Sequence, residues 1–274
     1  MPAAPPNESP MPKWKLVIAS HDGNKDLWPY FFHFLWRFWP EVPTPVYLIT
    51  NHTTFDSPKV KTIHTGPDRA WSDNIRDSLV SIQADYVIFM LDDMFLNTVV
   101  NTDSLAEIYR EFIQRQGLFC ELHVRQDFEP EAGGGRLRHI PDTSLIAGIN
   151  CAYWRKDFLA KACVPGRTIW KVDAEVRRLN REQGERMFYT NCSHPELDYV
   201  ESVKGGFWKP EGIDYLAKNG MRPNLLLRPC PLQGRDWFSK MYRSLLKRGM
   251  KIWRGIEQKK GMRKMVRPFQ VNES

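Results

Sequence analysis

Short apolar runs alternate with longer amphipathic segments between positions 15 and 124. The runs at 15–20, 46–50 and 60–64 are rich in β-branched residues and predict strands. The strongly aromatic segment 27–38 stops before Pro40 and predicts a buried crossover helix, because proline ends a helix.

The same alternation continues further along the chain. A helix is expected over 72–82 with Ser72 as its N-cap, and the apolar run 86–91 predicts the next strand. The patterned segment 102–116 predicts another helix, and 118–124 predicts a further strand. Strands that alternate with helices in this way predict an α/β fold with a doubly wound, mostly parallel sheet.

Two adjacent aspartates, Asp92 and Asp93, stand directly after the apolar run YVIFML. Ligands of open α/β sheets bind at the carboxyl ends of the strands, so these carboxylates are expected to line a crevice. Two hard oxygen donors suit Mg²⁺ or Mn²⁺. The alternative is that the pair ends the strand as turn or N-cap residues.

The first predicted strand lacks the usual phosphate-binding sequences after it. Neither GxGxxG nor GxxxxGKS/T is present there, so the fingerprints of dinucleotide-binding and P-loop proteins are missing. Phosphates must then be held in another way, and a metal ion on Asp93 would do so.

Composition narrows the class of protein. The 274 residues, 42% of them hydrophobic, can bury one large α/β core with a small appendage. No apolar run is long enough to span a membrane, and the proline-rich stretch 1–12 lacks the parts of a signal peptide, so we expect a flexible leader. The five cysteines form no CxxC pair, which argues against a disulfide framework and a zinc cluster. A reducing cytoplasm is the expected environment.

The net charge of +7 is concentrated near the carboxyl terminus. The segment 235–267 holds 12 Lys or Arg against two acids, which leaves 27 basic and 30 acidic residues elsewhere. Aromatic and aliphatic residues recur there at roughly helical spacing. We therefore expect 235–274 to be a basic amphipathic helical tail on an anionic membrane surface, where each basic residue contributes about 1 kcal/mol. Packing on the body and binding to nucleic acid are the alternatives.

Several segments together resemble a glycosyltransferase of the GT-A fold. KLVIAS, VYLIT, DRAWSDNIRDSL and YVIFMLDD occur in the order of its nucleotide-sugar half, with LDD as the DxD-type motif. The segments SLIAGINCAYWRKDFL and TIWKVDAEV are similar to bacterial glycosyltransferases encoded with surface-polysaccharide genes. The resemblance covers roughly 13–216. It implies a GT-A-like domain over 13–234, with the nucleotide-sugar half to about 125 and the acceptor half after it.

The resemblance implies different roles for the two aspartates. Leu91 replaces the first aspartate of a strict DxD motif, and the last acid of such motifs usually contacts the metal. Asp93 is therefore the first candidate for the metal ligand, and Asp92 for a ribose contact or a supporting part of the metal site. His194 is a candidate third ligand, although a lone histidine before proline is also typical of a loop. The metal, Mn²⁺ or Mg²⁺, would neutralise the diphosphate leaving group as a Lewis acid.

The resemblance also implies that the segment after the first strand contacts the nucleotide. Ser20, His21 and Asp22 occupy that segment, although HDGN is equally well explained as an ordinary turn.

Two basic residues are candidates for phosphate contacts. Arg69 lies in the DRAWSDN loop, where a guanidinium could form bidentate contacts to phosphate, and Lys204 lies in VKGG. A surface ion pair of Arg69 with Asp68 or Asp73 is the alternative.

The segment TIWKVDAEV contains the candidate general base of an inverting transfer. Its W-x-x-acid spacing matches the W-x-x-E of the resembling family and points to Asp173, with Glu175 as the other candidate. Both acids could instead be solvated helix residues that pair with the arginines after them. Trp154 and Trp208 are candidates for stacking on a sugar ring, with burial in the core as the alternative.

Together these observations predict a metal-dependent glycosyltransferase of the hexosyltransferase type. It would move a sugar from a nucleoside diphosphate donor to a glycan or lipid-linked acceptor in bacterial surface-polysaccharide synthesis, on the inner face of the cell membrane. A nucleotidyltransferase is the first alternative, and the missing glycine-rich loop counts against it. A non-catalytic nucleic-acid-binding protein that uses the basic tail is the second. The acidic balance of the body counts against that alternative, so no nucleic-acid partner is expected.

Overall fold

An eight-stranded sheet forms the centre of the computed structural model, which describes residues 13–123, 135–140, 148–192 and 194–230. Its strands are β1 (Trp14–Ala19), β2 (Val46–Thr50), β3 (Val60–His64), β4 (Tyr86–Leu91), β6 (Phe119–Glu121), β7 (Leu137–His139), β8 (Ala152–Arg155) and β9 (Met187–Thr190). The helices are α1 (Trp28–Phe38), α2 (Trp71–Leu79), α3 (Thr102–Gln114), α4 (Lys156–Ala162), α5 (Ile169–Gln183) and α6 (Pro210–Lys218).

The strand order is β3-β2-β1-β4-β8-β6-β9-β7, and four of the seven neighbouring pairs are parallel. β3, β2, β1 and β4 are parallel neighbours, and β6 pairs with β9 in parallel. β8 and β7 run antiparallel to their neighbours. The doubly wound, mostly parallel sheet expected from the hydrophobic pattern is therefore confirmed, with two antiparallel strands added.

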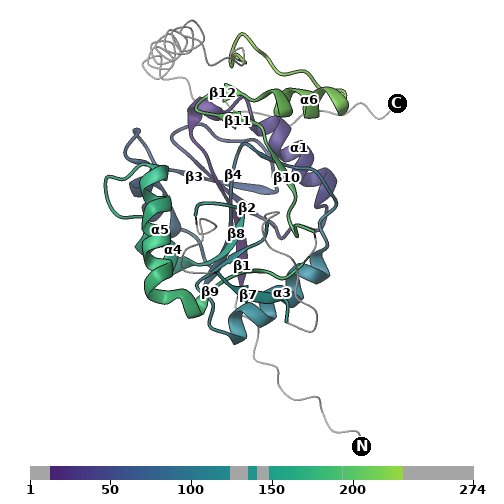
Figure 1. Ribbon diagram of the computed structural model, residues 1–274. Helices are drawn as coiled ribbons and strands as arrows, with labels where there is room; N and C mark the ends of the chain where they lie inside the picture. The colour runs from purple at the N-terminus through teal and green to yellow at the C-terminus, as the bar shows by residue number, and fades with distance from the viewer. Residues whose placement is uncertain (1–12, 124–134, 141–147, 193, 231–274) are drawn as a thin grey trace, which may run out of the picture.

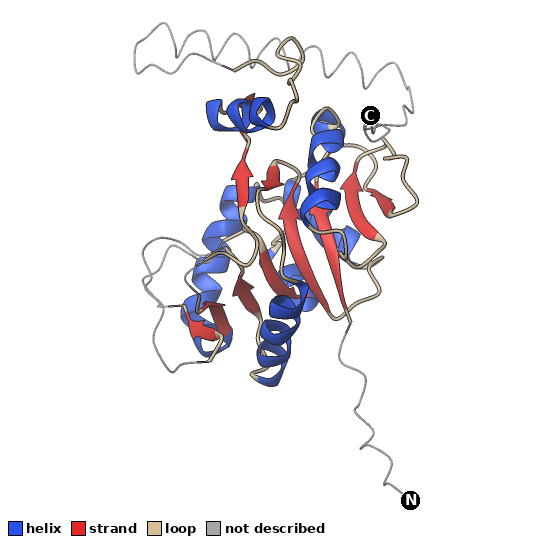
Figure 2. Cartoon of the chain, turned by 90° about the vertical axis from the view of Figure 1, so that its right-hand side faces the viewer, coloured by secondary structure: helices blue, strands red, loops and turns tan. Residues whose placement is uncertain are grey.

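Helices cover both faces of this sheet. Successive residues of β1 alternate between two cores, because side chains of a strand point to opposite faces. One core joins Leu16 and Ile18 to α1, α3 and α6, and the other joins Val17 and Ala19 to α2, α4 and α5. Figure 1 shows α4 and α5 on one side of the strands and α1 and α3 on the other, and Figure 2 shows the strands between these layers.

The aromatic helix α1 is buried as expected, since it makes the crossover from β1 to β2. Its ring contacts include Phe32 with Phe55, whose centroids are 4.3 Å apart, and Phe34 with Tyr215 at 4.7 Å. The last turn closes when the Trp39 N–H donates to the Leu35 carbonyl, one residue before Pro40.

Two expected elements have different bounds in the structure. α2 ends at Leu79, three residues before the expected end at 82. It begins at Trp71, and the hydroxyl of Ser72 does not cap it but accepts a hydrogen bond from the Arg167 N–H at 2.9 Å. Tertiary contact with the segment before α5 thus replaced the local cap. The strand expected over 118–124 is shortened to β6, and residue 124 lies outside the described residues.

Two further strand pairs lie outside the eight-stranded sheet. β5 (Met94–Leu96) pairs with β10 (Tyr199–Glu201), and β11 (Val203–Lys204) pairs with β12 (Phe207–Trp208). α6 packs beside β10, and its Tyr215 hydroxyl donates to the Leu96 carbonyl at 2.5 Å.

The expected leader at 1–12 and the expected tail at 235–274 both lie outside the described residues. None of the helices in the described ranges is long and apolar enough to cross a membrane.

Gly212 tests how closely α6 approaches the strand region beneath it. A Cβ added there would lie 2.7 Å from the Cα and the carbonyl oxygen of Ser202, which are backbone atoms. We expect Gly212→Ala to lower the free energy of unfolding by about 1–3 kcal/mol, although alanine is favoured over glycine in a helix by about 1 kcal/mol. Urea denaturation measures this change. Asp214→Ala, on the exposed face of α6, should be neutral or stabilising. A Gly212→Ala protein as stable as the wild type would contradict the close approach.

Candidate functional site

The carboxyl ends of β1 and β4 lie side by side, because the two strands are parallel neighbours with Ala19 opposite Leu91. The turn after β1 contains the short helix η1 (Asp22–Asn24), and Asp92 and Asp93 follow β4 at the same edge. This arrangement is the crevice position in which open α/β sheets bind ligands.

Asp92 is buried, and both of its carboxylate oxygens accept hydrogen bonds. The Ser20 hydroxyl donates to Oδ2, and the Asn24 amide donates to Oδ1 at 3.0 Å. The Trp28 indole N–H donates to Ser20 Oγ at 2.7 Å, which leaves the hydroxyl proton directed at Asp92. The carboxylate is therefore held in place by the turn after β1 and by α1.

Asp93 has a different environment. Its Oδ1 is buried and has no hydrogen-bond partner among the described residues, while its backbone carbonyl accepts from the Ser202 N–H at 2.9 Å. Glu201 lies opposite Met94 in the β5–β10 pair, which brings a third carboxylate near. A buried, unpaired carboxylate oxygen is destabilising, so Asp93 has the character of a ligand-binding group.

Burial raises the pKa of both carboxyl groups. The pKa of Asp92 rises to about 6 because burial outweighs the hydrogen bonds from Ser20 and Asn24 and the charge of Arg228. The pKa of Asp93 rises to about 8, first through burial and then through the negative charges of Asp92 and Glu201. A bound cation would favour the ionised form of both groups.

Arg228 is a buried cation that the sequence analysis did not identify. Its guanidinium forms a bidentate pair with Asp26, in which two nitrogens donate at 3.0 and 2.9 Å. It also donates to the carbonyls of Gly23 and Gly206 at 3.1 Å. The segment before position 230 is thereby joined to the turn after β1.

The same guanidinium orients Asn24. Arg228 donates to Asn24 Oδ1 at 2.9 Å, so the amide nitrogen of Asn24 is the group that faces Asp92. Asn24 could have been found from the sequence, since it lies in the HDGN turn. Arg228 could not, because 204 residues separate it from its partner and LLLRPCP carries no motif.

The acid pair fits a divalent cation. Mg²⁺ is usually bound by one or two carboxylates, with substrate phosphates and water as the other ligands. Asp93 Oδ1 is the oxygen that could coordinate the cation, because it has no hydrogen-bond partner among the described residues. Asp92 supplies a neighbouring negative charge. His194 is exposed in the loop after β9, and nowhere in the described ranges do three or more His, Cys, Asp or Glu gather as a metal site. The structure therefore does not bring His194 to the two aspartates, and its role as a ligand stays a prediction.

Asp22 organises the neighbouring turn after β2. Its Oδ1 accepts from the backbone N–H groups of Asn51, His52 and Thr53 at 3.0 to 3.1 Å. The side chain of His21 accepts a backbone N–H within its own turn at 3.1 Å. Of the three nucleotide-contact candidates, Ser20 is the one that touches the acid pair, and a nucleotide contact of any of them stays a prediction.

The two candidates for phosphate contacts lie apart from each other. Arg69 forms an ion pair with Asp77 at 2.9 Å, not with Asp68 or Asp73. Both side chains are about half-exposed, so the pair adds little stability and leaves the guanidinium accessible. Lys204 is exposed in the β11–β12 hairpin, whose turn contacts Arg228. Both assignments stay predictions.

The two candidates for the general base differ in position. Asp173 Oδ1 accepts from the Ile149 N–H at 2.6 Å, and this segment precedes β8 at the same sheet edge as Asp92, because β8 runs antiparallel to β4. Glu175 instead contacts Arg178 at 2.6 Å. That hydrogen bond holds the pKa of Glu175 below its ordinary value. The position of Asp173 at this edge and the lowered pKa of Glu175 thus favour Asp173 as the candidate base.

The tryptophans singled out as sugar platforms belong to the core. Trp154 and Trp208 are both buried, so neither can stack on a ligand. Trp170, in the first turn of α5, is 68% exposed. In the sequence, the feature that could have indicated this exposure is the place of Trp170 in the W-x-x-acid segment TIWKVDAEV.

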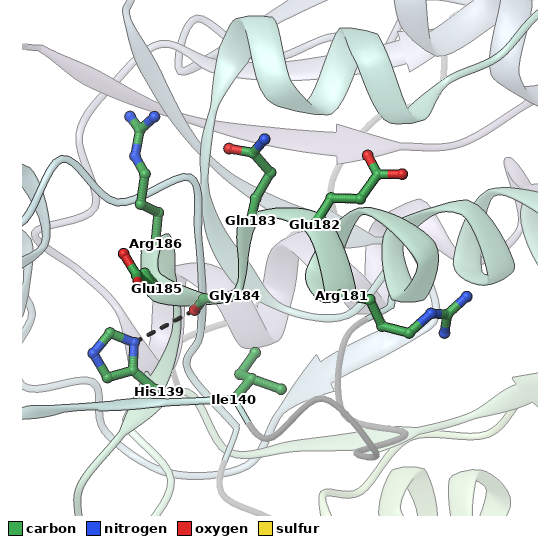
Figure 3. A pocket seen from close by; sticks show the side chains of 8 residues that line it. All are labelled: His139, Ile140, Arg181, Glu182, Gln183, Gly184, Glu185 and Arg186. Atoms are coloured by element: carbon green, nitrogen blue, oxygen red, sulfur yellow. Dashed lines mark hydrogen bonds between the residues drawn. The ribbon is translucent and has the colours of Figure 1, made fainter.

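A cavity of about 490 Å³ lies at the far end of α5, where His139 and Ile140 meet residues 181–186 (Figure 3). His139 Nδ1 is 3.4 Å from the Gly184 carbonyl oxygen. Because α5 runs from the Asp173 edge of the sheet to the opposite edge, this cavity is separate from the acid pair.

No protein-family model matches the chain, and a search of curated proteins finds no similar sequence. Similar solved structures include TarS of S. aureus, residues 1–349, at 8% identity and a TM-score of 0.47; the match covers 68% of this chain and 59% of that chain. TarS in complex with UDP-GlcNAc is 10% identical with a TM-score of 0.45, over 68% of this chain and 57% of that chain.

A cytidylyltransferase from Leptospira borgpetersenii is 12% identical with a TM-score of 0.42, over 76% of this chain and 95% of that chain. All of these TM-scores are below 0.5, and no role of this chain follows from the likeness. This chain spans 59% of the first of these TarS chains.

The raised pKa of Asp93 predicts a pH-dependent loss of stability. The folded protein binds the Asp93 proton more tightly than the unfolded chain, whose carboxyl pKa is near 3.8. The stabilisation is complete below about pH 4 and is lost as the pH rises through about 8. In EDTA, Asp93→Asn should therefore be more stable than the wild type at pH 8, by about 1 kcal/mol or more, and the difference should shrink toward pH 4.

Thermal unfolding of both proteins across this pH range measures the effect. Asp85→Asn, at the opposite end of the same strand, should follow the wild type. If the difference in stability between Asp93→Asn and wild type stays constant from pH 4 to 8, folding does not raise the pKa of Asp93.

Proposed function

We propose that this chain is a transferase that binds a nucleoside diphosphate sugar at the edge formed by β1 and β4, and that it acts as a glycosyltransferase. The single observation that supports this is the pair Asp92 and Asp93 at the end of β4, with one buried carboxylate oxygen left without a partner. The TarS structure with UDP-GlcNAc is a protein of similar fold with such a ligand.

Asp93 and Asp92 would hold Mg²⁺ or Mn²⁺, which when bound offsets the charge of the diphosphate leaving group. Asn24 and Ser20 keep the Asp92 carboxylate in one orientation, and Arg228 fixes the amide of Asn24. A site held in this way is preorganised, so little reorganisation accompanies the reaction.

Asp173 is the proposed general base on the acceptor side. Its carboxylate lies at the start of α5, at the same sheet edge as the acid pair, and would accept the proton of the acceptor hydroxyl as the new bond forms. A glycan or lipid-linked acceptor at the inner face of a bacterial membrane remains part of this proposal. The tail that would contact the membrane lies outside the described residues, so that contact stays a prediction.

We expect Asp93→Ala to reduce sugar transfer about 10²-fold or more and to abolish Mn²⁺-dependent nucleotide binding, because the free carboxylate oxygen is removed. Circular dichroism should show an unchanged fold. Asp85→Ala, which removes an exposed carboxylate from the other end of β4, is the matched control and should keep full activity.

The donor assay uses a panel of nucleoside diphosphate sugars with separate detection of nucleoside diphosphate and pyrophosphate. Release of nucleoside diphosphate supports a glycosyltransferase, whereas pyrophosphate release from a nucleoside triphosphate supports the nucleotidyltransferase alternative. A folded Asp93→Ala protein with normal turnover would overturn the assignment of this site.

Asp173→Asn separates catalysis from structure. The asparagine oxygen can still accept from the Ile149 N–H, but the group can no longer take a proton. We expect turnover to fall by about 10²-fold with little change in donor affinity. Steady-state kinetics with Glu175→Gln as the control decides between the two acids, because loss of turnover only in Glu175→Gln would place the base at Glu175.

A further inference from the structure

A second concave surface, which we call the α5 groove, lies between α5 and the loop that precedes it. Its volume is about 490 Å³, and its charged lining residues are Arg167, Lys171, Glu175, Arg178 and Arg181. Four positive charges and one negative charge thus face one cavity. Neither the acid pair nor Asp173 lines it.

Most of this positive charge is not neutralised within the described part of the protein. Arg178 is engaged by Glu175 and Glu182, both on the same helix. For Arg167, Lys171 and Arg181, the described residues provide no ion-pair partner. A cavity with three cations that no described residue pairs attracts anions, and guanidinium groups favour carboxylate or phosphate.

The charges act together on the one acid present. The pKa of Glu175 lies below its ordinary value, first through the hydrogen bond from Arg178 and further through the charges of Arg178, Arg167 and Lys161. The field in the groove therefore stabilises a negative charge even where solvent is near.

An exposed aromatic ring borders the groove. Trp170, 68% exposed, is adjacent in sequence to Lys171 and one helical turn before Asp173 and Ala174. An exposed indole next to cations suits a ligand that has both an apolar ring face and an anionic group. A sugar that carries phosphate or carboxylate has both features.

We propose that the α5 groove binds the anionic group of a phosphorylated or carboxylated saccharide acceptor, with the sugar ring against Trp170. This inference rests on the proposed function, since it identifies the class of acceptor for that site. α5 connects the two, because the helix that begins with Trp170 and Asp173 continues as one wall of the groove.

Two other anionic partners fit less well. A bilayer surface requires several large apolar side chains that insert together, whereas the groove lining contributes only the small Val164 and Ala174, with Trp170 beside it. Duplex nucleic acid requires an interface on the order of 1,000 Å² or more, whereas this cavity accommodates a few anionic groups and contains Glu175.

Removal of two groove charges tests the proposal. We compare Lys171→Gln/Arg181→Gln with a control, Lys218→Gln/Arg222→Gln, which removes two exposed charges at and just after α6. Arg181 also lines the cavity at His139, although Figure 3 shows its side chain extending away from His139, whereas Lys171 lines the α5 groove without lining that cavity. Circular dichroism checks that both proteins are folded.

The probes are oligogalacturonate, inorganic polyphosphate and a neutral galacto-oligosaccharide of equal length, measured by calorimetry in EDTA. We expect the wild type and the control to bind one or both anions and to bind the neutral sugar much more weakly. Lys171→Gln/Arg181→Gln should weaken anion binding about tenfold or more, and Trp170→Ala should weaken oligogalacturonate more than polyphosphate. Preference between the anions identifies carboxylate or phosphate as the recognised group.

Equal anion binding by wild type and Lys171→Gln/Arg181→Gln would overturn the proposed role of the groove. The same holds if the neutral sugar binds as tightly as the anions, or if neither anion binds. An effect limited to duplex RNA or anionic vesicles would also overturn it in favour of those partners. Asp93→Ala separates the two proposals, because it should lose nucleotide binding and keep anion binding. Anion binding by a protein that shows no sugar transfer would retain the groove and reject the glycosyltransferase assignment.

Discussion

The burial of two adjacent carboxylates at the end of β4 is the constraint around which the neighbouring segments are arranged. An ionised carboxylate that loses its hydration is strongly destabilising unless polar partners replace the water. Asp92 has such partners in Ser20 and Asn24, and Arg228 supplies the opposite charge. Asp93 Oδ1 has none among the described residues. This difference favours a supporting role for Asp92 and a ligand-binding role for Asp93.

Much of the fold was predictable because its first half depends on local patterns. The apolar runs of β1, β2 and β4 are long enough to identify as strands, and α1 is ended by a proline. The antiparallel strand β8 was not predicted, since its first three residues, Ala152, Tyr153 and Trp154, are all buried and carry no periodicity that would separate strand from helix. The start of α2 was missed because Ser72 bonds to Arg167, a tertiary contact that outweighs the local capping preference.

The part of the site that depends on local sequence was also predictable. Asp92, Asp93 and Ser20 follow strands directly, so the rule that ligands bind at carboxyl ends of strands places them at one edge. Asp173 was identified because its W-x-x-acid spacing matches the resembling family, and the structure adds its contact with Ile149. Arg228 could not be predicted, because a buried cation is recognised by its partners and these lie near the other end of the chain. Burial also decided which tryptophans are accessible, and composition cannot show this.

The reach of Arg228 has a consequence for the order in which the protein forms during synthesis. Its guanidinium contacts a carbonyl 205 residues earlier, so the turn after β1 leaves the ribosome long before its cation exists. β1, α1 and β2 can assemble from adjacent sequence, whereas the amide of Asn24 is oriented by Arg228 only after that distant segment has been made. A nascent chain therefore holds Asp92 without the charge of Arg228 until the segment around position 228 has been synthesised.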